Sequence, residues 1–261
     1  AAVTGVQTCA LPILFAIPLF LGNLFQQLYN TADSLIVGNY LGSNALAAVS
    51  SSGNLIFLMV GFINGIAMGA GVVIARYYGA KDRANLEKSI HTTVAFGIAA
   101  GIALTVIGML LAPKILVLMG TPAEVLPESI TYFRTYFAGS IGVIMYNIFV
   151  GILQSLEEFN VPAALSVVSN GVLILYYIFF NEKFGILGLT AAFLIGWAMQ
   201  AVIQIPSLWK KGYHYRPDFH FKDDGLRKIG RLMLPVMVST WIQPINFMVN
   251  TRFASQLSSG N

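Results

Sequence analysis

The sequence predicts an all-α, polytopic membrane protein, and three observations lead to this prediction. Of its 261 residues, 56% are hydrophobic and only 10% are charged, with a mean hydropathy of +0.73. Soluble globular proteins carry about 25% charged residues. The apolar residues gather in seven stretches that can cross the roughly 30 Å hydrocarbon core as helices. Finally, the seventh stretch repeats a polar pattern found in the first.

The seven expected spans divide the chain into a bundle and a second, partial unit. They lie at 14–37, 47–75, 89–112, 129–153, 162–180, 186–207 and 232–256. We interpret 1–13 as a non-native leader, 14–207 as an N-terminal six-helix bundle, 208–231 as a cytoplasmic connecting loop and 232–261 as the first helix of a second bundle, the rest of which is missing. In the second span, Gly61, Gly65 and Gly69 have the small-xxx-small spacing that permits close helix contact in lipid.

Polar side chains form matching stripes on the first and seventh spans. When Pro18 is aligned with Pro235, Gln26 falls on Gln243, Asp33 on Asn250 and Ser34 on Thr251. Within each span the polar residues recur at steps of three or four, so they share one face of a helix. A polar stripe avoids lipid, so both stripes should face one cavity between two repeats, which is a transporter architecture.

Asp33 is the single acidic residue inside a confident span. A charged Asp at mid-membrane costs roughly 2.5–3.5 kcal/mol, so such residues are usually functional. We expect Asp33 to bind a coupling ion, with Gln26, Asn30 and Ser34 on the same face lining the cavity. The alternative is that Asp33 lies near the outer end of its span and only hydrates or caps it.

Basic residues predict the orientation of the chain. The segments 76–88 and 208–231 hold eleven of the fifteen Lys and Arg residues. The positive-inside rule therefore places these connections and the N-terminus in the cytoplasm. The connection between the fourth and fifth spans should also be cytoplasmic, yet it carries Glu157 and Glu158 and no base. The aromatic and basic residues of 208–231 also suit anionic lipid headgroups.

Catalytic and metal-binding motifs are absent from the sequence. We find no His-Glu-x-x-His, no Gly-x-Ser-x-Gly and no phosphate-binding loop. Cys9 is the single cysteine, and no pair of histidines has metal-ligand spacing. A membrane-embedded enzyme would require His91 to meet a second catalytic group, and none is evident. We therefore expect no enzyme, no catalytic residue, no cofactor and no metal, with no nucleic-acid partner. Arg134 and Arg252 could contact an anionic headgroup or snorkel to the interface.

Residues 17–147 resemble the multidrug and toxic compound extrusion (MATE) family. The resemblance rests on Ile17-Pro18, on the run from Gln27 to Ser34, on Ala45–Val49, on Gly69–Ile74 with Tyr78–Asp82, and on Leu118–Pro122. The resemblance implies that the acidic residue of the first helix, here Asp33, couples transport to protons or sodium. In that family the fifth-span Asn170 would be followed one turn later by Asp, and here Ile174 stands there.

Residues 148–261 resemble the MurJ/MviN family of lipid II flippases. The motifs are Gly151–Ser155, Pro162–Ala164, Asn170, Gly188-Leu189, Gln204–Pro206, Arg231–Pro235 and Asn250–Ser255. Both families belong to one exporter superfamily, built from two six-helix bundles. The sequence reads as a junction of the two near Tyr146-Asn147, and a full member would be about twice as long. The first span lacks the Arg that the flippase resemblance implies.

These resemblances imply a secondary active exporter in the bacterial cytoplasmic (inner) membrane. It would be a monomer that expels amphipathic or cationic small molecules by alternating access, coupled to a proton or sodium ion. Asp33 would carry the ion, and the cavity would be lined by Gln26, Asn30, Ser34, Tyr146, Asn170, Gln243 and Asn250. The alternative is a flippase for a lipid-linked peptidoglycan precursor, with Arg134 and Arg252 as the candidate pyrophosphate contacts.

Overall fold

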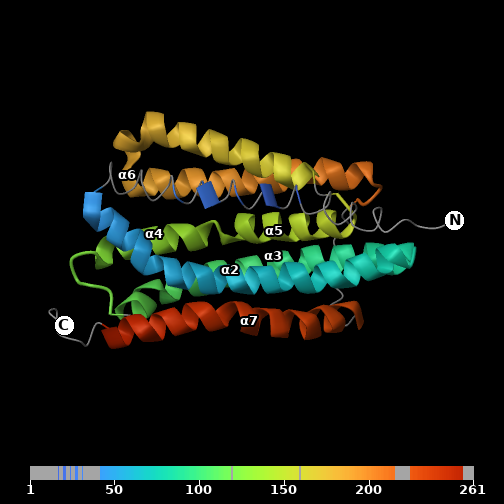
Figure 1. Ribbon diagram of the computed structural model, residues 1–261, viewed down its shortest axis with the longest axis horizontal. Helices are drawn as coiled ribbons and strands as arrows, with labels where there is room; N and C mark the ends of the chain where they lie inside the picture. Colours follow the sequence, from blue (N-terminus) through green and yellow to red (C-terminus); the bar gives the residue numbers. More distant parts are fainter. Residues whose placement is uncertain are drawn as a thin grey trace.

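The computed structural model describes residues 42–118, 120–158, 160–214 and 224–254, with a few single positions between Ile17 and Thr31. Every element in these ranges is an α-helix, and none is a strand. The helices run along the long axis of the molecule and form an elongated bundle (Figure 1). The predicted all-α class is confirmed.

The described helices match most of the predicted spans. They are α2 (Gly42–Gly79), α3 (Arg83–Leu118), α4 (Leu126–Ala138), α5 (Ser140–Ser155), α6 (Asn160–Lys210) and α7 (Asp224–Ala254). Within the described ranges, Met59–Gly79, Arg83–Leu118 and Thr190–Lys210 are each long and apolar enough to cross a membrane. The span predicted at 14–37 lies almost wholly outside the described residues, so it stays a prediction.

The fourth predicted span, 129–153, is broken in the middle. It consists of α4 and α5, which are bent by 48° at Gly139 and pass the length and apolarity test only as a pair. Leu194 of α6 fills the space beside Gly139, where an added Cβ would lie 2.5 Å from the Leu194 side chain. Beside the break, the Ser140 hydroxyl lies 2.9 Å from the Thr105 hydroxyl of α3. The bend is therefore anchored to both neighbouring helices.

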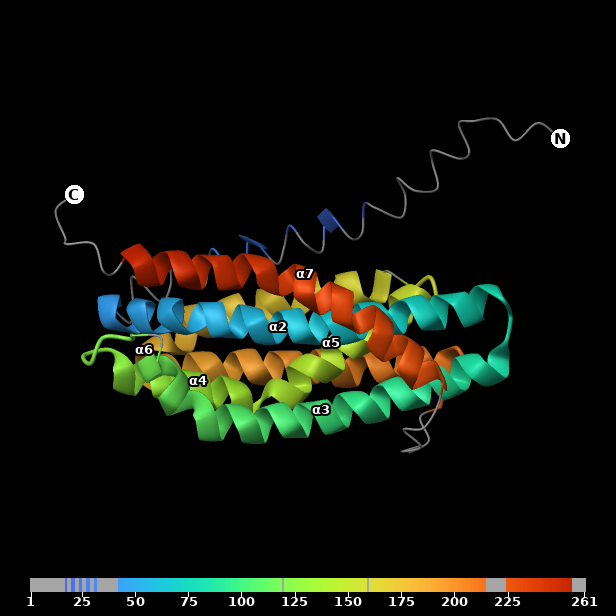
Figure 2. The same cartoon turned by 90° about the horizontal axis from the view of Figure 1, so that it is seen from below.

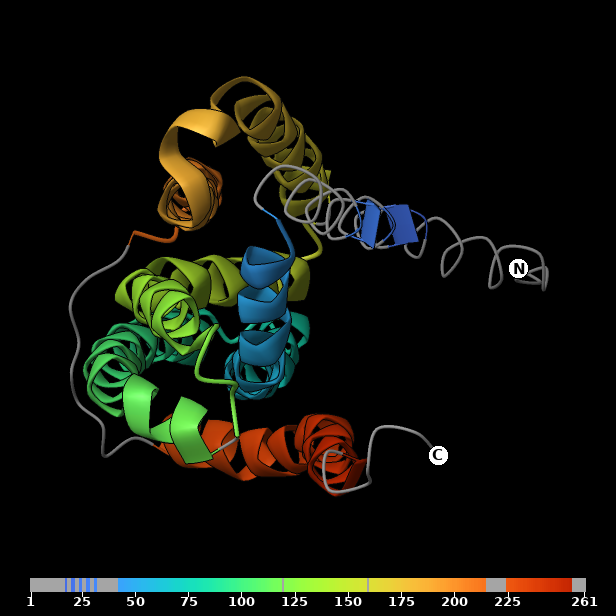
Figure 3. The same ribbon diagram turned by 90° about the vertical axis from the view of Figure 1, so that its left-hand side faces the viewer.

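The fifth and sixth predicted spans fall within α6. This element is helical throughout Asn160–Lys210, so the connection predicted at 181–185 is not an extended loop. The chain nevertheless doubles back within α6, and its two arms lie antiparallel at the upper edge of the bundle (Figures 1 and 3). The first arm contains the predicted span 162–180, and the second contains Thr190–Lys210. The connection predicted at 113–128 is also shorter than expected, because α3 continues through Pro113 to Leu118.

The glycines of α2 form a close seam with α7, as their spacing predicts. The two helices lie side by side and run in opposite directions (Figure 2). A Cβ at Gly61 would lie 2.9 Å from the Thr240 hydroxyl, and one at Gly69 would lie 2.9 Å from the Ile229 carbonyl oxygen. Glycine permits this approach because it has no side chain. We call this contact the α2–α7 seam.

The hydrophobic core lies between α2, α3 and α5. Its largest fully buried side chains are almost all branched aliphatics from these helices, namely Ile63, Ile66, Ile74, Leu116, Ile144, Ile148, Ile152 and Leu153. Phe133 of α4 closes one side of this cluster. The outward faces of α3 and α6 carry exposed Ile, Val, Leu and Met, as expected for helices that face lipid.

Candidate functional site

Tyr146 is the predicted cavity residue that the structure describes most fully. It lies on α5, is half-buried, and meets the edge of Trp197 from α6 with ring centroids 4.5 Å apart and planes at 90°. This edge-to-face arrangement is favourable for aromatic rings. Asn170 lies on the first arm of α6, but its side chain is outside the described residues, so its place in the cavity stays a prediction.

The second arm of α6 carries a buried polar stripe that the sequence prediction missed. Thr190, Gln200 and Gln204 are all buried, and Trp197 is half-buried between them. Positions 190, 197 and 204 are separated by seven residues, which is two helical turns, so they share a face. A search for polar residues at this period within an apolar span would have found the stripe.

The α6 stripe lies close to α4 and α5. Ala198 packs against Gly142, and Leu194 packs against Gly139. In both contacts the α6 residue comes about 55 residues later in the chain than its partner, so the two segments run nearly parallel. The same register places Gln204 level with the buried Phe149 of α5. Because Thr190, Gln200 and Gln204 are buried, these polar groups lie in the packed interior of the described bundle.

Gln204 is the most unusual member of the stripe. Its side chain is fully buried, and its Nε2 donates a hydrogen bond to the Gln200 carbonyl oxygen at 3.2 Å. Its Oε1 has no hydrogen-bond partner among the described residues. Leaving a buried acceptor unsatisfied costs about 1–3 kcal/mol. A polar side chain buried in a membrane-spanning helix makes Gln204 a candidate for binding or conformational change.

The α7 stripe is described in part. Asn250 is exposed, and its Nδ2 donates to Asn246 Oδ1 at 3.2 Å, one turn away. These two amides share a face of the helix, as the sequence predicts. The side chain of Gln243 is outside the described residues, so its position beside the cavity stays a prediction.

The predicted ion-coupling residues of the first span are not described. Gln26, Asn30, Asp33 and Ser34 all lie outside the described residues, so their roles stay predictions. Nearby, Thr31 donates from its hydroxyl to the Gln27 carbonyl oxygen at 3.0 Å.

Arg134 and Arg252 are the two predicted contacts for an anionic headgroup. Arg134 is exposed on α4, and its Nε donates to the Met109 carbonyl oxygen of α3 at 3.3 Å. That contact keeps Arg134 against α3. The side chain of Arg252 lies outside the described residues.

No group of three His, Cys, Asp or Glu residues in the described ranges could hold a metal ion. His91 is half-buried and already engaged with neighbouring groups.

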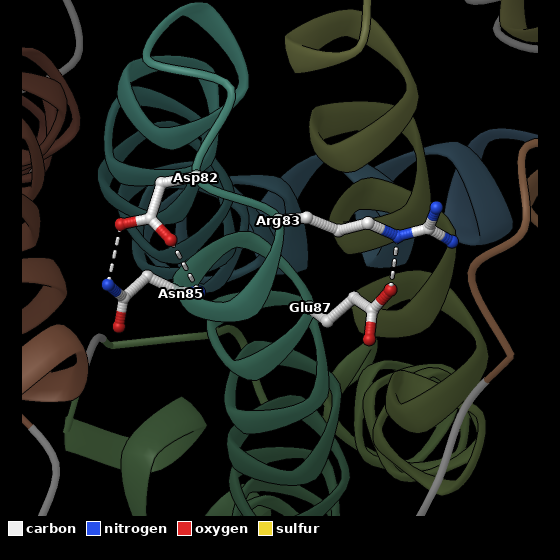
Figure 4. A network of polar contacts seen from close by, with 4 residues as sticks. All are labelled: Asp82, Arg83, Asn85 and Glu87. Atoms are coloured by element: carbon white, nitrogen blue, oxygen red, sulfur yellow. Dashed lines mark hydrogen bonds and ion pairs between the residues drawn. The ribbon is translucent and has the colours of Figure 1, made fainter.

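The turn between α2 and α3 explains part of the motif Tyr78–Asp82. Lys81 adopts a left-handed conformation with φ of 56°, which reverses the chain between the two helices. Asp82 then caps α3: its Oδ1 accepts from the Asn85 backbone N–H at 3.2 Å, and its Oδ2 accepts from Asn85 Nδ2 at 2.7 Å (Figure 4). The hydrogen bond from the Asn85 side chain, and to a smaller extent the one from the Asn85 backbone, hold the pKa of Asp82 below its ordinary value. This motif therefore has a structural role.

Side-chain contacts link the connections at this end of the bundle. Arg83 and Glu87 pair at 2.8 Å along α3 (Figure 4), and Lys211 pairs with Glu158 at 2.8 Å. The hydrogen bond to Glu158 raises the pKa of Lys211. Arg83 also approaches the 6–7 connection, since a Cβ added at Gly212 would lie 3.2 Å from Arg83 Nη2. The three connections predicted to be cytoplasmic, 2–3, 4–5 and 6–7, therefore lie at one end of the molecule.

The fold and the buried polar stripe define a polytopic membrane transporter, and comparison with known proteins gives its family. The family model described as MatE matches residues 18–179, so the chain belongs to the MatE family. This match extends past residue 147, where the MATE resemblance was expected to end.

Curated relatives come from both expected families. The chain is 35% identical over 156 residues to the probable multidrug resistance protein YoeA of Bacillus subtilis, a match that covers 60% of this chain and 34% of that protein. It is 26% identical over 195 residues to the probable lipid II flippase MurJ of Buchnera aphidicola, covering 72% and 38%. The MurJ match is longer than 148–261, so the two relationships overlap instead of meeting at Tyr146-Asn147.

Solved structures share the fold. A multidrug resistance MATE family transporter of the MOP superfamily, in an outward-facing conformation, superposes with a TM-score of 0.80 at 25% identity, covering 87% of this chain and 52% of that one. A MOP superfamily transporter from Pyrococcus furiosus gives a TM-score of 0.79 at 24% identity, with the same coverage. The chain thus spans about half of these structures and little more than a third of the curated relatives described above.

Proposed function

We propose that the chain forms part of a secondary active exporter of the MATE type, which expels amphipathic or cationic small molecules in exchange for protons or sodium ions. The observation that carries this proposal is the family match over 18–179, which includes Asp33 on the polar face of an otherwise apolar span. Relatives named for multidrug resistance or export support it, among them YoeA and the multidrug export protein MepA of Staphylococcus aureus, the latter 25% identical over 132 residues.

In this proposal, Asp33 binds the coupling ion and the polar stripes bind the transported molecule. Gln26, Asn30 and Ser34 supply oxygen atoms beside the carboxylate. Tyr146 and Trp197 form an aromatic corner, and aromatic faces attract organic cations. Asn170, Gln243 and Asn250 line the rest of the cavity between the two repeats. Alternating access follows when the repeats rock about this cavity.

The proposed orientation follows from the charges at the two ends. The end that holds the 2–3, 4–5 and 6–7 connections also holds most of the described bases, so it faces the cytoplasm under the positive-inside rule. The N-terminus would then lie on the same side. The protein would act as a monomer in the bacterial inner membrane.

The decisive experiment compares two Asp→Asn substitutions in a full-length version of the protein reconstituted in vesicles. Asp33→Asn should abolish ion-driven efflux, because Asn keeps the size of the side chain but cannot gain or lose a charge, and a ligand with equal affinity for both states shifts nothing. Asp82→Asn is the matched control, since Asn also caps helices, and it should transport normally. Unchanged efflux and ion dependence in Asp33→Asn would refute the coupling role.

A lipid II-type flippase is the second candidate, favoured by the MurJ relatives. A flippase must hold a pyrophosphate, for which paired Arg side chains are best suited. Arg134 is exposed and donates to the Met109 carbonyl oxygen, and the Arg252 side chain lies outside the described residues, so no such pair is seen among the described side chains. Movement of a fluorescent lipid-linked pyrophosphate across vesicles, with no drug efflux, would favour the flippase.

A further inference from the structure

Three exposed bases share one face of α7 at its first turns, beside the α2–α7 seam. Arg227 and Arg231 are four residues apart, and Lys228 and Arg231 are three apart, so all three project from neighbouring positions of the helix. The antiparallel register of the seam, set by the approach of Gly69 to Ile229 and Met233, brings the end of α2 near them. Arg76, also exposed, lies in that last turn of α2.

Lys228 bridges the two helices at this point. Its Nζ donates to the Tyr77 hydroxyl of α2 at 3.4 Å and lies 5.9 Å from the centre of the Tyr77 ring. An ammonium group has three donors, so this contact leaves others for an anion. The contact between Lys228 and Tyr77 therefore joins α7 to α2 at the basic end of the α2–α7 seam.

The bases of the seam form no ion pair among the described side chains. Arg83 and Lys211, at the same end of the bundle, pair with Glu87 and Glu158. By contrast, neither Arg76, Arg227 nor Arg231 forms an ion pair with a carboxylate among the described side chains. Like Lys81 and Lys210 at the same end, these three bases therefore stay available to an anion, as far as the described side chains go.

Exposed apolar side chains lie directly beside these bases, toward the centre of the bundle. Val72 is one turn before Arg76 on α2, and Leu232 and Leu234 follow Arg231 on α7; all three are exposed. Bases above an apolar surface are the arrangement that holds a phosphate group at the membrane interface while acyl chains cover the helices. A soluble anion would use the charges but not the apolar surface.

We propose that Arg227, Lys228 and Arg231, together with Arg76 of α2, bind the phosphate headgroup of an anionic phospholipid at the basic end of the α2–α7 seam. A bound headgroup would link the first bundle to α7. This site is distinct from the proposed transport cavity, and its test needs no transport measurement, so it stands or falls separately from the exporter proposal.

The test measures lipid binding to the detergent-purified full chain by native mass spectrometry, with phosphatidylglycerol and phosphatidylcholine of matched acyl chains. The seam double variant Arg227→Gln/Arg231→Gln is compared with Lys81→Gln/Lys210→Gln, which removes the same charge from exposed positions at the same end. Each base near an anionic lipid surface contributes enough that losing two should weaken phosphatidylglycerol binding about tenfold or more. The control pair should change it by less than about threefold, and phosphatidylcholine should bind weakly throughout.

Two further arms distinguish a lipid headgroup site from a folding defect and from a site for free phosphate. Arg227→Lys/Arg231→Lys keeps the charge and should retain binding, which separates loss of charge from loss of folding. Inorganic phosphate at millimolar concentration should not compete, because it lacks the acyl chains. Equal loss in the two Gln pairs would reduce the effect to diffuse charge and overturn the proposal. Equal binding of both lipids, or efficient competition by phosphate, would also overturn it.

Discussion

Lys211 and Glu158 form an ion pair at 2.8 Å that joins the connection after α5 to the connection after α6. Lys211 Nζ also donates to the Leu156 carbonyl oxygen at 3.4 Å, which is an acceptor at the C-terminal end of α5. This pair gives Glu158 a basic partner although the 4–5 connection has no base of its own. The base that the positive-inside pattern lacks there is supplied from the 6–7 connection.

We expect the Lys211–Glu158 pair to make a modest contribution to stability. Both side chains are about one-third exposed, and ion pairs near water contribute below about 1 kcal/mol. In a double-mutant cycle with Lys211→Met and Glu158→Gln, the coupling energy should be positive but below about 1 kcal/mol. The unfolding of the detergent-solubilised protein would give this value. A coupling energy of zero would mean that the contact to Leu156 alone positions Lys211.

The pH dependence of that pair should appear only in the alkaline range. Glu158 raises the pKa of Lys211 above its ordinary value of 10.5, so the folded state holds this proton more tightly than the unfolded state. Its stabilisation is therefore complete below pH 10.5 and lost as the pH rises through the folded-state pKa. The difference in thermal midpoint between the wild type and Lys211→Met should be constant from pH 7 to 9 and shrink above about pH 10.5. A difference that grows with pH would contradict this assignment.

Cysteine labelling should show that the basic end faces the cytoplasm. In a background with Cys9→Ser, cysteines at Lys81 and Lys210 should react with a membrane-impermeant thiol reagent from the cytoplasmic side only. A cysteine at Ser43, at the opposite end of α2, should react from outside. Both lysines are exposed, so their replacement should leave the fold unchanged. Labelling of position 210 from outside would reverse the proposed orientation.

The α2–α7 seam should be intolerant of a single methyl group. Gly69→Ala would place a Cβ 2.9 Å from the Ile229 carbonyl oxygen and 3.0 Å from the Met233 nitrogen, and backbone atoms cannot move aside as a side chain can. Overpacking of this kind costs about 1–3 kcal/mol. Gly79→Ala is the matched control, since no atom lies within 4 Å of its added Cβ. Thermal melts should show a lower midpoint for Gly69→Ala alone, and equal midpoints would mean that α7 shifts freely.

The sequence predicted those features that depend on periodic apolar and small residues. Gly61, Gly65 and Gly69 indicated a close helix contact, although their spacing could not name α7 as the partner. The bend at Gly139 was not predicted, because an apolar run through 129–153 has the same composition whether it is straight or broken. It is the packing of Leu194 from α6, distant in sequence, that occupies the space beside Gly139.

Of the candidate site, the sequence identified Tyr146 but not its partner. Trp197 and Gln200 were missed, and Gln204 was noted only as part of the flippase resemblance, because the span 186–207 was taken as an ordinary apolar span. Their importance depends on burial that only the packed helices create. The excess of basic residues at one end was evident from the sequence. Which of them are neutralised could be known only from the pairs formed by Arg83 and Lys211.

Replacing Gln204 by Leu should separate stability from transport. The buried Oε1 has no partner among the described residues, and the hydrogen bond from Nε2 goes to the Gln200 carbonyl oxygen within the same helix. Leu has a similar volume and no unsatisfied oxygen, so the thermal midpoint should stay the same or rise. If Gln204 binds the transported molecule or water around it, efflux by the full-length protein should fall by about 5- to 150-fold, the equivalent of one lost polar contact.

Gln154→Leu, the same change at a half-buried position of α5, should leave efflux unchanged. A clear drop in the thermal midpoint of Gln204→Leu would instead mean that its oxygen accepts a structural hydrogen bond, for example from a buried water, and that the glutamine is retained for folding.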